Sequence, residues 1–397
     1  MQAWLRDVVF ERFQAFAGAG LGVCIGFALV GALDGIGPWR AAGAIGALAA
    51  SQALAFPVAA RTSGAAGPAG SAARLYRDLV FVLGLAALAA IGAAGLHALV
   101  QVGAASAAGA TGAGATGAAW VAAAGLASAG VLLSGHALRP RRVRVSQQRV
   151  AFPEGAPALR IAHVSDLHLG NGTGVVRVER LVRQTNALGA DLVALTGDLF
   201  DGPAELLAPG ARALAGLRAP LGVFAVLGNH DVGLGAERVA RALAEHAPDI
   251  ALLRGEGRRV DLAGGALWIG GVDDPGRDWT RGGHLPALAA LAARRPPGVA
   301  SLLLVHRPDA FPEAAELGFD LVLSGHYHGG QVALPGSGGR LGPATLLTPF
   351  ARGVHRRGDA TLFVSRGIGY AGPRFRLGSP PELAVLACAP APEAAAS

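Results

Sequence analysis

The sequence predicts an α/β domain that follows a region of four membrane-spanning helices. Two observations divide the chain. Up to about residue 138 it contains four long apolar stretches almost free of charge, and after that strand-length apolar runs alternate with helix-like segments. A third observation is a set of Asp, Asn and His residues at the ends of the strand-length runs. This set indicates what the α/β domain does.

The composition supports a membrane-embedded part. Of 397 residues, 52% are hydrophobic and only 15% are charged, which is more apolar than an average soluble protein. The formal net charge is +7, and such basicity favours an anionic partner, either a membrane surface or nucleic acid. Only two cysteines are present, which excludes a disulfide framework and a thiolate metal cluster.

Each of the four apolar stretches is about long enough to cross a bilayer, which takes roughly 20 helical residues. The alternative is a soluble helical bundle rich in alanine. The stretches are Phe13–Leu33, Ala41–Ala60, Leu79–Val102 and Ala118–Leu138.

The arginines that flank these stretches predict their orientation. Counted over the short flanks, ten arginines lie on the side of the two termini, and Arg40 alone lies on the opposite side. Because positive charge is enriched in cytoplasmic loops, we expect both termini and the α/β domain to face the cytoplasm.

The α/β domain begins with the alternating segment Arg142–Val145, which predicts a half-buried strand. Helix-like patterns cover Gly174–Leu188, Ala204–Leu217 and Ala236–Glu245. Alternation of strands and helices is typical of an α/β fold. The apolar runs of strand length are Leu159–Val164, Leu192–Thr196, Val223–Leu227, Leu267–Val272, Ser301–Val305, Leu321–Ser324 and Leu362–Ser365.

Five short polar segments come directly after these runs or at their ends. In open α/β sheets, ligands bind beyond the carboxyl ends of the strands. A mixture of carboxylate, amide and imidazole without thiolate suits Mn²⁺, Fe or Zn²⁺ at a catalytic site better than a structural zinc. Each residue alone could be a turn former or a helix cap, so the prediction depends on the ordered set. The segments are Asp166-Leu-His168, Gly197-Asp198-Leu-Phe-Asp201, Gly228-Asn229-His230-Asp231, His306 and Gly325-His326-Tyr-His328.

In order and spacing, these segments resemble the D-x-H, G-D-x-x-D, G-N-H-D/E, H and G-H-x-H blocks of the calcineurin-like metallophosphoesterase family. The resemblance covers Leu159 to Leu386. It implies a four-layer α/β/β/α sandwich around two divalent metal ions (Mn²⁺, Fe²⁺/Fe³⁺ or Zn²⁺). We therefore divide the chain into a four-span transmembrane region (1–139), a metallophosphoesterase domain (140–388) and a disordered tail (389–397).

The resemblance also implies a role for each site residue. Asp198 would bridge the two metal ions. His230 would be the histidine beside the scissile phosphate, with Asp201 fixing its tautomer. The remaining ligands would divide between the metals, with Asp166, His168 and His328 on the first and Asn229, His306 and His326 on the second.

Three further segments are similar to a bacterial membrane-associated branch of the family. They are Gly325–Gln331, Ser365–Gly369 and Arg374–Glu382. That branch includes membrane-attached phosphodiesterases and UDP-diacylglucosamine pyrophosphohydrolases.

The resemblance to this branch implies a phosphoesterase in the bacterial cytoplasmic membrane that hydrolyses a phosphodiester or pyrophosphate bond in a lipid-linked or nucleotide-lipid substrate. The alternatives are a membrane sensor with a non-catalytic metal site, or a nuclease. Nucleic acid is disfavoured as a substrate because no aromatic and basic stacking platform is evident. The sequence predicts no oligomeric state.

Several other residues near the blocks have two interpretations each. Arg366 and Arg374 could clamp a substrate phosphate or form surface ion pairs. Asp273 and Asp274 could contact substrate, but the Asp-Asp-Pro sequence favours a turn. Gln331 is expected near the site. Four residues are expected in the core, namely His163, Trp268, Phe319 and Phe363.

Overall fold

The computed structural model describes residues 142–153, 156–333, 342, 344–372, 374 and 376–390. The four predicted membrane spans and residues 391–397 of the predicted tail lie outside the described residues. Within the described ranges, no helix combines the length and the apolar character needed to cross a bilayer.

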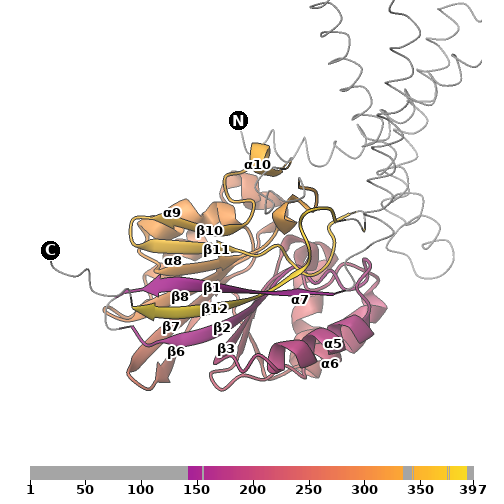
Figure 1. Cartoon of the computed structure of the whole chain (residues 1–397), viewed down its shortest axis with the longest axis horizontal. Helices are drawn as coiled ribbons and strands as arrows, with labels where there is room; N and C mark the ends of the chain where they lie inside the picture. Colours follow the sequence, from indigo (N-terminus) through magenta and orange to yellow (C-terminus); the bar gives the residue numbers. More distant parts are fainter. Residues whose placement is uncertain are drawn as a thin grey trace, which may run out of the picture. The chain divides into compact units, whose positions relative to one another are not determined.

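Two mixed sheets of six strands each organise the described residues. In the first sheet β2, β3, β4 and β5 are parallel. Strand β12 runs antiparallel to β2 and parallel to the edge strand β1. Figure 1 shows β1 beside β12. Across this sheet the strands are β1 (Arg144–Phe152), β12 (Glu382–Pro390), β2 (Leu159–Val164), β3 (Leu192–Thr196), β4 (Val223–Val226) and β5 (Ile250–Leu252).

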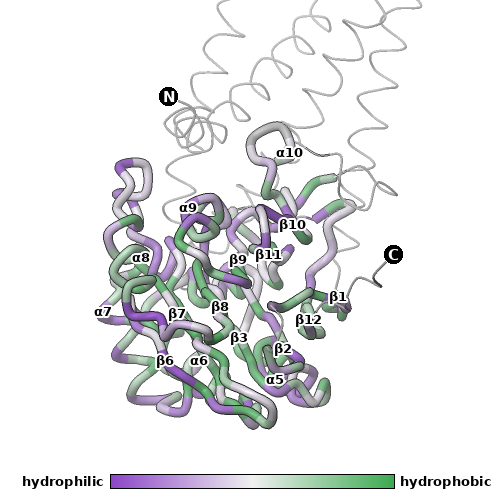
Figure 2. The backbone as a smooth tube through the Cα atoms, turned by 90° about the vertical axis from the view of Figure 1, so that its left-hand side faces the viewer, coloured by the Kyte–Doolittle hydropathy of each residue, from purple (hydrophilic) through white to green (hydrophobic). Residues whose placement is uncertain are grey.

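The second sheet has a parallel centre formed by β7, β8, β9 and β11, with antiparallel strands at both edges. Its edge strand β6 carries exposed charged residues, which Figure 2 shows as a hydrophilic segment. Across the sheet the strands are β10 (Gly353–Arg357), β11 (Ala360–Val364), β9 (Leu321–Ser324), β8 (Ala300–Val305), β7 (Gly265–Val272) and β6 (Glu256–Leu262).

The two sheets face each other across one apolar cluster. Ile161 and Leu192 from the first sheet lie in the same cluster as Leu302 and Leu321 from the second. Strands buried on both faces read as continuous apolar runs, which explains why β2, β3, β8 and β9 could be recognised in the sequence.

Helices cover the other face of each sheet. Leu181 of α5 and Leu214 of α6 share a cluster with the first sheet, and Leu288 of α8 and Phe311 of α9 share a cluster with the second. Figure 1 accordingly shows α5 and α6 on one side of the sheets and α8 and α9 on the other. The helices are α5 (Val175–Asn186), α6 (Leu207–Leu214), α7 (Asn229–His246), α8 (Leu285–Ala292), α9 (Phe311–Glu316) and α10 (Ala344–Leu347).

The prediction of an α/β fold is confirmed. All seven predicted apolar runs are strands within two residues of their predicted bounds, and the three helix-like patterns overlap α5, α6 and α7. The first strand begins at Arg144 rather than Arg142, and β12 continues to Pro390, two residues into the predicted tail.

The sequence analysis missed β5, β6, β10 and β12 and the helices α8, α9 and α10. Strand β6 has no apolar run because most of its side chains are exposed, and α8 is so rich in Ala and Leu that its polar face is weak. The core predictions are confirmed, since the exposed fractions of His163, Trp268, Phe319 and Phe363 are 0%, 3%, 1% and 1%.

Candidate metal centre

The predicted ligands lie where the parallel strands of both sheets end. Asp166 and His168 follow β2, and Asp198 follows β3. Asn229 begins α7 directly after β4, while His306 follows β8 and the Gly325–His328 segment follows β9. Because these strands run parallel within each sheet, their carboxyl ends meet at one edge of the fold.

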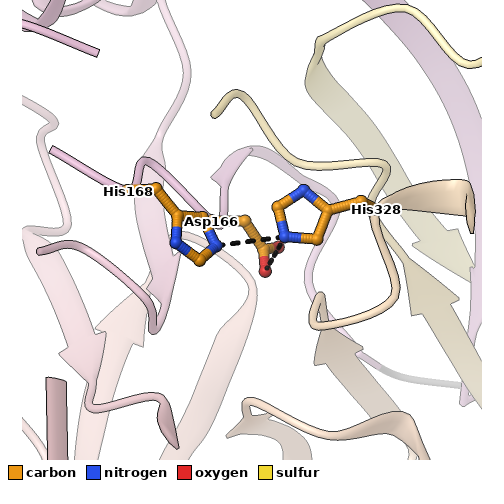
Figure 3. A group of neighbouring side chains, drawn as sticks. All are labelled: Asp166, His168 and His328. Atoms are coloured by element: carbon orange, nitrogen blue, oxygen red, sulfur yellow. Dashed lines mark hydrogen bonds and ion pairs between the residues drawn. The ribbon is translucent and has the colours of Figure 1, made fainter. Parts of the chain in front are cut away.

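One group of side chains consists of Asp166, His168 and His328, whose ligand atoms all lie within 4.8 Å of one another. Figure 3 shows them pointing toward a common centre. His168 Nε2 is 3.0 Å from His328 Nε2, and His328 Nε2 is 3.4 Å from Asp166 Oδ1. This group has the three residues that the resemblance assigns to the first metal.

A second group consists of Asp198, His306 and His326, within the same 4.8 Å limit. His306 Nε2 is 3.1 Å from Asp198 Oδ2 and 3.2 Å from His326 Nδ1. Asp198 Oδ2 also lies 3.5 Å from His168 Nε2 of the first group. The carboxylate of Asp198 therefore stands between the two groups, where a bridging ligand would stand.

Asn229 carries a buried amide oxygen that a cation could bind. Its Oδ1 is buried and, among the described residues, has no hydrogen-bond partner. A buried amide oxygen without a partner costs about 1–3 kcal/mol, and a divalent cation would satisfy it. The next residue lies against the centre, because His230 N donates to Asp198 Oδ1 over 2.8 Å. Carboxylates, imidazoles and one amide fit Mn²⁺, Fe or Zn²⁺.

Hydrogen-bond contacts of the Nδ1 atom orient two of the histidine rings. His306 Nδ1 lies 2.7 Å from the carbonyl oxygen of Thr196, and His168 Nδ1 lies 3.0 Å from Asp201 Oδ2. When Nδ1 donates to such an oxygen, Nε2 carries the lone pair that a metal needs. In both rings this leaves Nε2 turned toward the centre.

His230 stands at the accessible side of the centre, with 34% of its side chain exposed. Its Nδ1 lies 3.1 Å from Asp201 Oδ1, so the contact that sequence analysis expected between these two residues is present. Burial acts to lower the pKa of His230, but the carboxylates of Asp201 and Asp198 outweigh it and raise the pKa to about 10. A protonated imidazole can donate a proton to a leaving group.

The backbone of the centre is strained at the predicted ligands. Among the described residues, six that are not glycine have a positive φ, and five of them are predicted ligands. Such conformations cost about 1–3 kcal/mol each and concentrate at functional sites. The five are Asp166, His168, Asp198, His326 and His328.

Sequence analysis missed two residues that hold the centre together. Asp231 is fully buried and accepts hydrogen bonds from the backbone N–H groups of Leu199, Phe200 and Gly228. Burial and the charge of Asp198 raise the pKa of Asp231 to about 7. Arg376 is also buried, and its Nη2 lies 2.9 Å from Nδ1 of His328. Both residues lay inside segments that the sequence analysis quoted, but only their tertiary contacts reveal what they do.

The residues whose roles the sequence analysis left undecided lie around the centre. Arg366 forms an ion pair with Glu382 over 2.8 Å. The side chain of Gln331 hydrogen-bonds both backbone groups of Ala371. Arg374 packs against Gly172, in the loop after the D-x-H block. Arg366 is therefore engaged in an ion pair.

The two aspartates of the Asp-Asp-Pro sequence both bind backbone and arginine. Asp273 accepts from the backbone of Leu227 and from Arg254. Asp274 accepts from the backbone of Gly276 and from Arg307. The turn is present, and each carboxylate in it also holds one guanidinium.

Comparison with known proteins agrees with the geometry of the centre. The profile of the family described as "Calcineurin-like phosphoesterase" matches residues 159–330. An uncharacterized metallophosphoesterase of Bacillus subtilis, YkoQ, is 32% identical over 250 residues, which cover 61% of this chain and 88% of that protein. An uncharacterized metallophosphoesterase of Aquifex aeolicus is 34% identical over 238 residues, which cover 59% of this chain and 86% of that protein.

A relative from Bos taurus is called "Transmembrane protein with metallophosphoesterase domain" and is 32% identical over 251 residues, which cover 61% of this chain and 55% of that protein. The similar solved structures include TT1561 of Thermus thermophilus, at 16% identity and a TM-score of 0.35, with 52% of this chain and 89% of that chain covered. The chain thus spans most of the two bacterial relatives and about half of the bovine one.

Proposed function

The chain belongs to the calcineurin-like metallophosphoesterase family and is a metal-dependent phosphoesterase, and we propose that it hydrolyses a phosphodiester or pyrophosphate bond with two divalent cations. The observation that carries this proposal is the pair of adjacent ligand groups with the carboxylate of Asp198 between them. A single structural metal would need only one such group.

In this proposal the first cation is held by Asp166, His168 and His328 and the second by Asn229, His306 and His326, with Asp198 shared. When bound, two such cations supply Lewis-acid activation of water and neutralise charge on the phosphoryl group. The clustering of buried carboxylates and imidazoles supports the assignment, because each would be costly to bury without a charged partner. Mn²⁺, Fe and Zn²⁺ all suit the donor set.

His230 is the proton donor to the leaving group. Its Nδ1 contacts Asp201, so Nε2 is the atom left to face the substrate. Asp201 has its pKa lowered despite burial, chiefly by the charge of His230, and the ionised carboxylate keeps the ring in one orientation. The His230–Asp201 pair also argues against a sensor with a non-catalytic metal site, since binding alone does not require it.

We further propose that the enzyme is anchored in the bacterial cytoplasmic membrane by residues 1–139, with the domain of residues 140–388 arranged as a four-layer α/β/β/α sandwich facing the cytoplasm. The apolar stretches and the arginine asymmetry of the sequence support this. So do relatives whose names describe a transmembrane protein with this domain. A lipid-linked or nucleotide-lipid substrate would suit an active site held near the membrane.

The test is hydrolysis of bis(p-nitrophenyl) phosphate by the purified chain with added Mn²⁺. We expect turnover that a chelator abolishes, that added Mn²⁺ restores, and that Asp198→Ala loses. Equal turnover in the chelated enzyme or in Asp198→Ala would contradict the proposal.

Carbonate extraction of expressing cells tests the membrane anchor, and release of the chain into the soluble fraction would refute it. Lipid profiling of cells from which the gene for this protein has been deleted tests the substrate class. The expected result is accumulation of a phosphorylated lipid.

A further inference from the structure

Arg307 directly follows the predicted ligand His306 and is held from two sides. Its Nε donates to Asp274 Oδ2 over 2.6 Å, and its Cζ lies 5.1 Å from the ring centroid of Trp279. Trp279 belongs to the 3-10 helix η2 (Gly276–Arg281), which links β7 to α8. One carboxylate and one aromatic face therefore fix the guanidinium.

Both restraints are themselves fixed. Asp274 is 2% exposed, and its Oδ1 accepts the backbone N–H of Gly276 over 2.7 Å. The ring of Trp279 stacks on His284, with centroids 3.9 Å apart and an interplanar angle of 10°. Arg307 has thus already lost the side-chain freedom that binding would otherwise cost, which is the condition for a preorganised anion site.

The terminal groups of Arg307 are not used within the described part of the chain. Its hydrogen bonding to described residues ends at Nε, and 12% of its side chain is exposed. A guanidinium has five N–H donors and no acceptor, so both terminal NH₂ groups stay available. Two other arginines near the centre differ. Arg366 is paired with Glu382, and Arg376 donates to several carbonyl oxygens.

Arg307 lies on the side of the second ligand group. Arg307 adjoins His306 in the chain, and its positive charge, after burial, contributes to lowering the pKa of His326. The start of η2 also lies against α7, because a Cβ at Gly276 would be 3.2 Å from Val232 Cγ1. The 3-10 helix that carries Trp279 therefore packs against the first turn of α7, which begins at Asn229.

We propose that Arg307 binds non-bridging phosphoryl oxygens of the substrate through its two terminal NH₂ groups, with Asp274 and Trp279 as positioning residues. Parallel N–H donors of a guanidinium match two oxygens of one phosphoryl group. This inference rests on the proposed function, because it assumes that the reacting phosphoryl group lies at the paired ligand groups. It assigns the contact with the substrate phosphate to Arg307 rather than to Arg366, whose terminal Nη2 is paired with Glu382.

The matched control is Arg254. Arg254 contacts Asp273 through Nε over 2.8 Å, just as Arg307 contacts Asp274 in the next position, but it also uses Nη1 on Glu237. Replacing Arg254 therefore removes an arginine–aspartate pair of the same kind, but from an arginine whose terminal Nη1 is already paired with a carboxylate. The neighbouring aspartates Asp273 and Asp274 thus hold the control arginine and the test arginine, respectively.

The experiment measures the affinity of the Mn²⁺-loaded full chain for inorganic phosphate by calorimetry, together with bound metal per chain. We expect Arg307→Met to weaken phosphate binding by about 10- to 100-fold, the loss of a charge-assisted hydrogen-bond pair, with bound metal unchanged. Asp274→Asn should give a smaller loss, since the arginine remains but is no longer held. Arg254→Met should stay within about twofold of the unmodified protein.

Phosphate affinity in Arg307→Met that equals that of Arg254→Met would overturn the inference. If Arg307→Met does not fold, as judged by circular dichroism, Arg307→Lys and Arg254→Lys replace the pair and the same inequality is required. Failure of the proposed function looks different, because the unmodified protein would then bind neither metal nor phosphate. Loss of metal in Arg307→Met would also refute the inference, since the role would then be structural.

Discussion

At the scale of single residues, one carboxylate orients two imidazoles with different proposed roles. Asp201 Oδ2 contacts Nδ1 of His168, a proposed metal ligand, and Oδ1 contacts Nδ1 of His230, the proposed proton donor. Sequence analysis assigned only the second contact. Both rings therefore depend on the same side chain for their orientation.

This shared contact predicts different results for two variants. His230→Ala should lower turnover by about 10²- to 10⁴-fold, the range of general acid catalysis, and leave bound metal unchanged. Asp201→Asn should also weaken metal binding by about 10- to 100-fold, as loss of an outer partner of a metal-binding histidine does. Competition with a fluorescent chelator measures the metal affinity. Equal metal affinity in the two variants would show that Asp201 supports His230 alone.

His163 predicts a pH dependence of stability. The ring is fully buried, and burial lowers its pKa to about 3, with a small opposing effect from Glu382. Because the folded pKa lies below the ordinary value of 6.5, the unfolded chain binds the proton first as the pH falls. The contribution of the neutral His163 ring to the free energy of unfolding is complete above pH 6.5. It is lost between about pH 6.5 and 3, at up to about 1.4 kcal/mol per pH unit.

His163→Gln should therefore reduce the loss of unfolding free energy between pH 7 and pH 5, measured by urea titration of the full chain. The control is His246→Gln, because His246 is a partly exposed residue at the end of α7. An identical pH profile for His163→Gln and the unmodified protein would contradict the assignment.

At the scale of elements, the turns after the strands decide where the ligands stand. The loop after β11 packs on the D-x-H turn, with Gly369 N donating to Asp166 O over 2.6 Å and Ile368 N donating to Ser165 O over 3.0 Å. The turn after β4 packs as closely on Asp198, because a Cβ at Gly228 would overlap both its Oδ1 and its backbone N. Glycine at these turns therefore lets neighbouring backbones approach the ligands.

Gly228→Ala tests this close approach. Gly228 has φ −93° and ψ 177°, which alanine adopts freely, so any effect comes from the overlap with Asp198. We expect loss of bound metal and of most turnover. Gly233→Ala in α7 is the control. Nothing lies within 4 Å of a Cβ there, so metal should be retained and stability should rise by about 0.5–1 kcal/mol. Full metal content in Gly228→Ala, measured by mass spectrometry, would contradict the packing argument.

At the scale of the whole domain, the centre joins the two sheets. Asp166 and Asp198 follow strands of the first sheet, whereas His306 and His326 follow strands of the second. The contact between His306 and Asp198 crosses from one sheet to the other. A cation bound there would bind the folded state only, since the unfolded chain does not assemble these ligands.

Metal should therefore raise the melting temperature of the domain. Binding at 100 times the dissociation constant stabilises the folded state by about 2.7 kcal/mol. We expect Mn²⁺ to raise the melting temperature of the unmodified protein and to have much less effect on Asp198→Ala. Asp261→Ala on the exposed edge strand β6 should respond like the unmodified protein. An equal rise in all three, measured by scanning calorimetry, would place the bound metal elsewhere.

Much of the fold and of the candidate site follows from the sequence, because local chemistry specifies it. Runs such as Leu192–Thr196 are buried on both faces, so they remain apolar throughout and identify the central strands. The five polar segments stand at strand ends, and parallel strands bring their ends together. The α/β class and the identity of the clustered residues could therefore be predicted without coordinates.

Tertiary structure alone decided the partners of side chains that no local pattern marks. The sequence could not distinguish Arg366, paired with Glu382 sixteen residues later, from Arg307, whose Nε meets Asp274 across 33 residues. Nor could it assign both His168 and His230 to Asp201. Periodicity reports which side of an element is buried, whereas the direction of a guanidinium or carboxylate depends on contacts between residues that only the folded chain brings together.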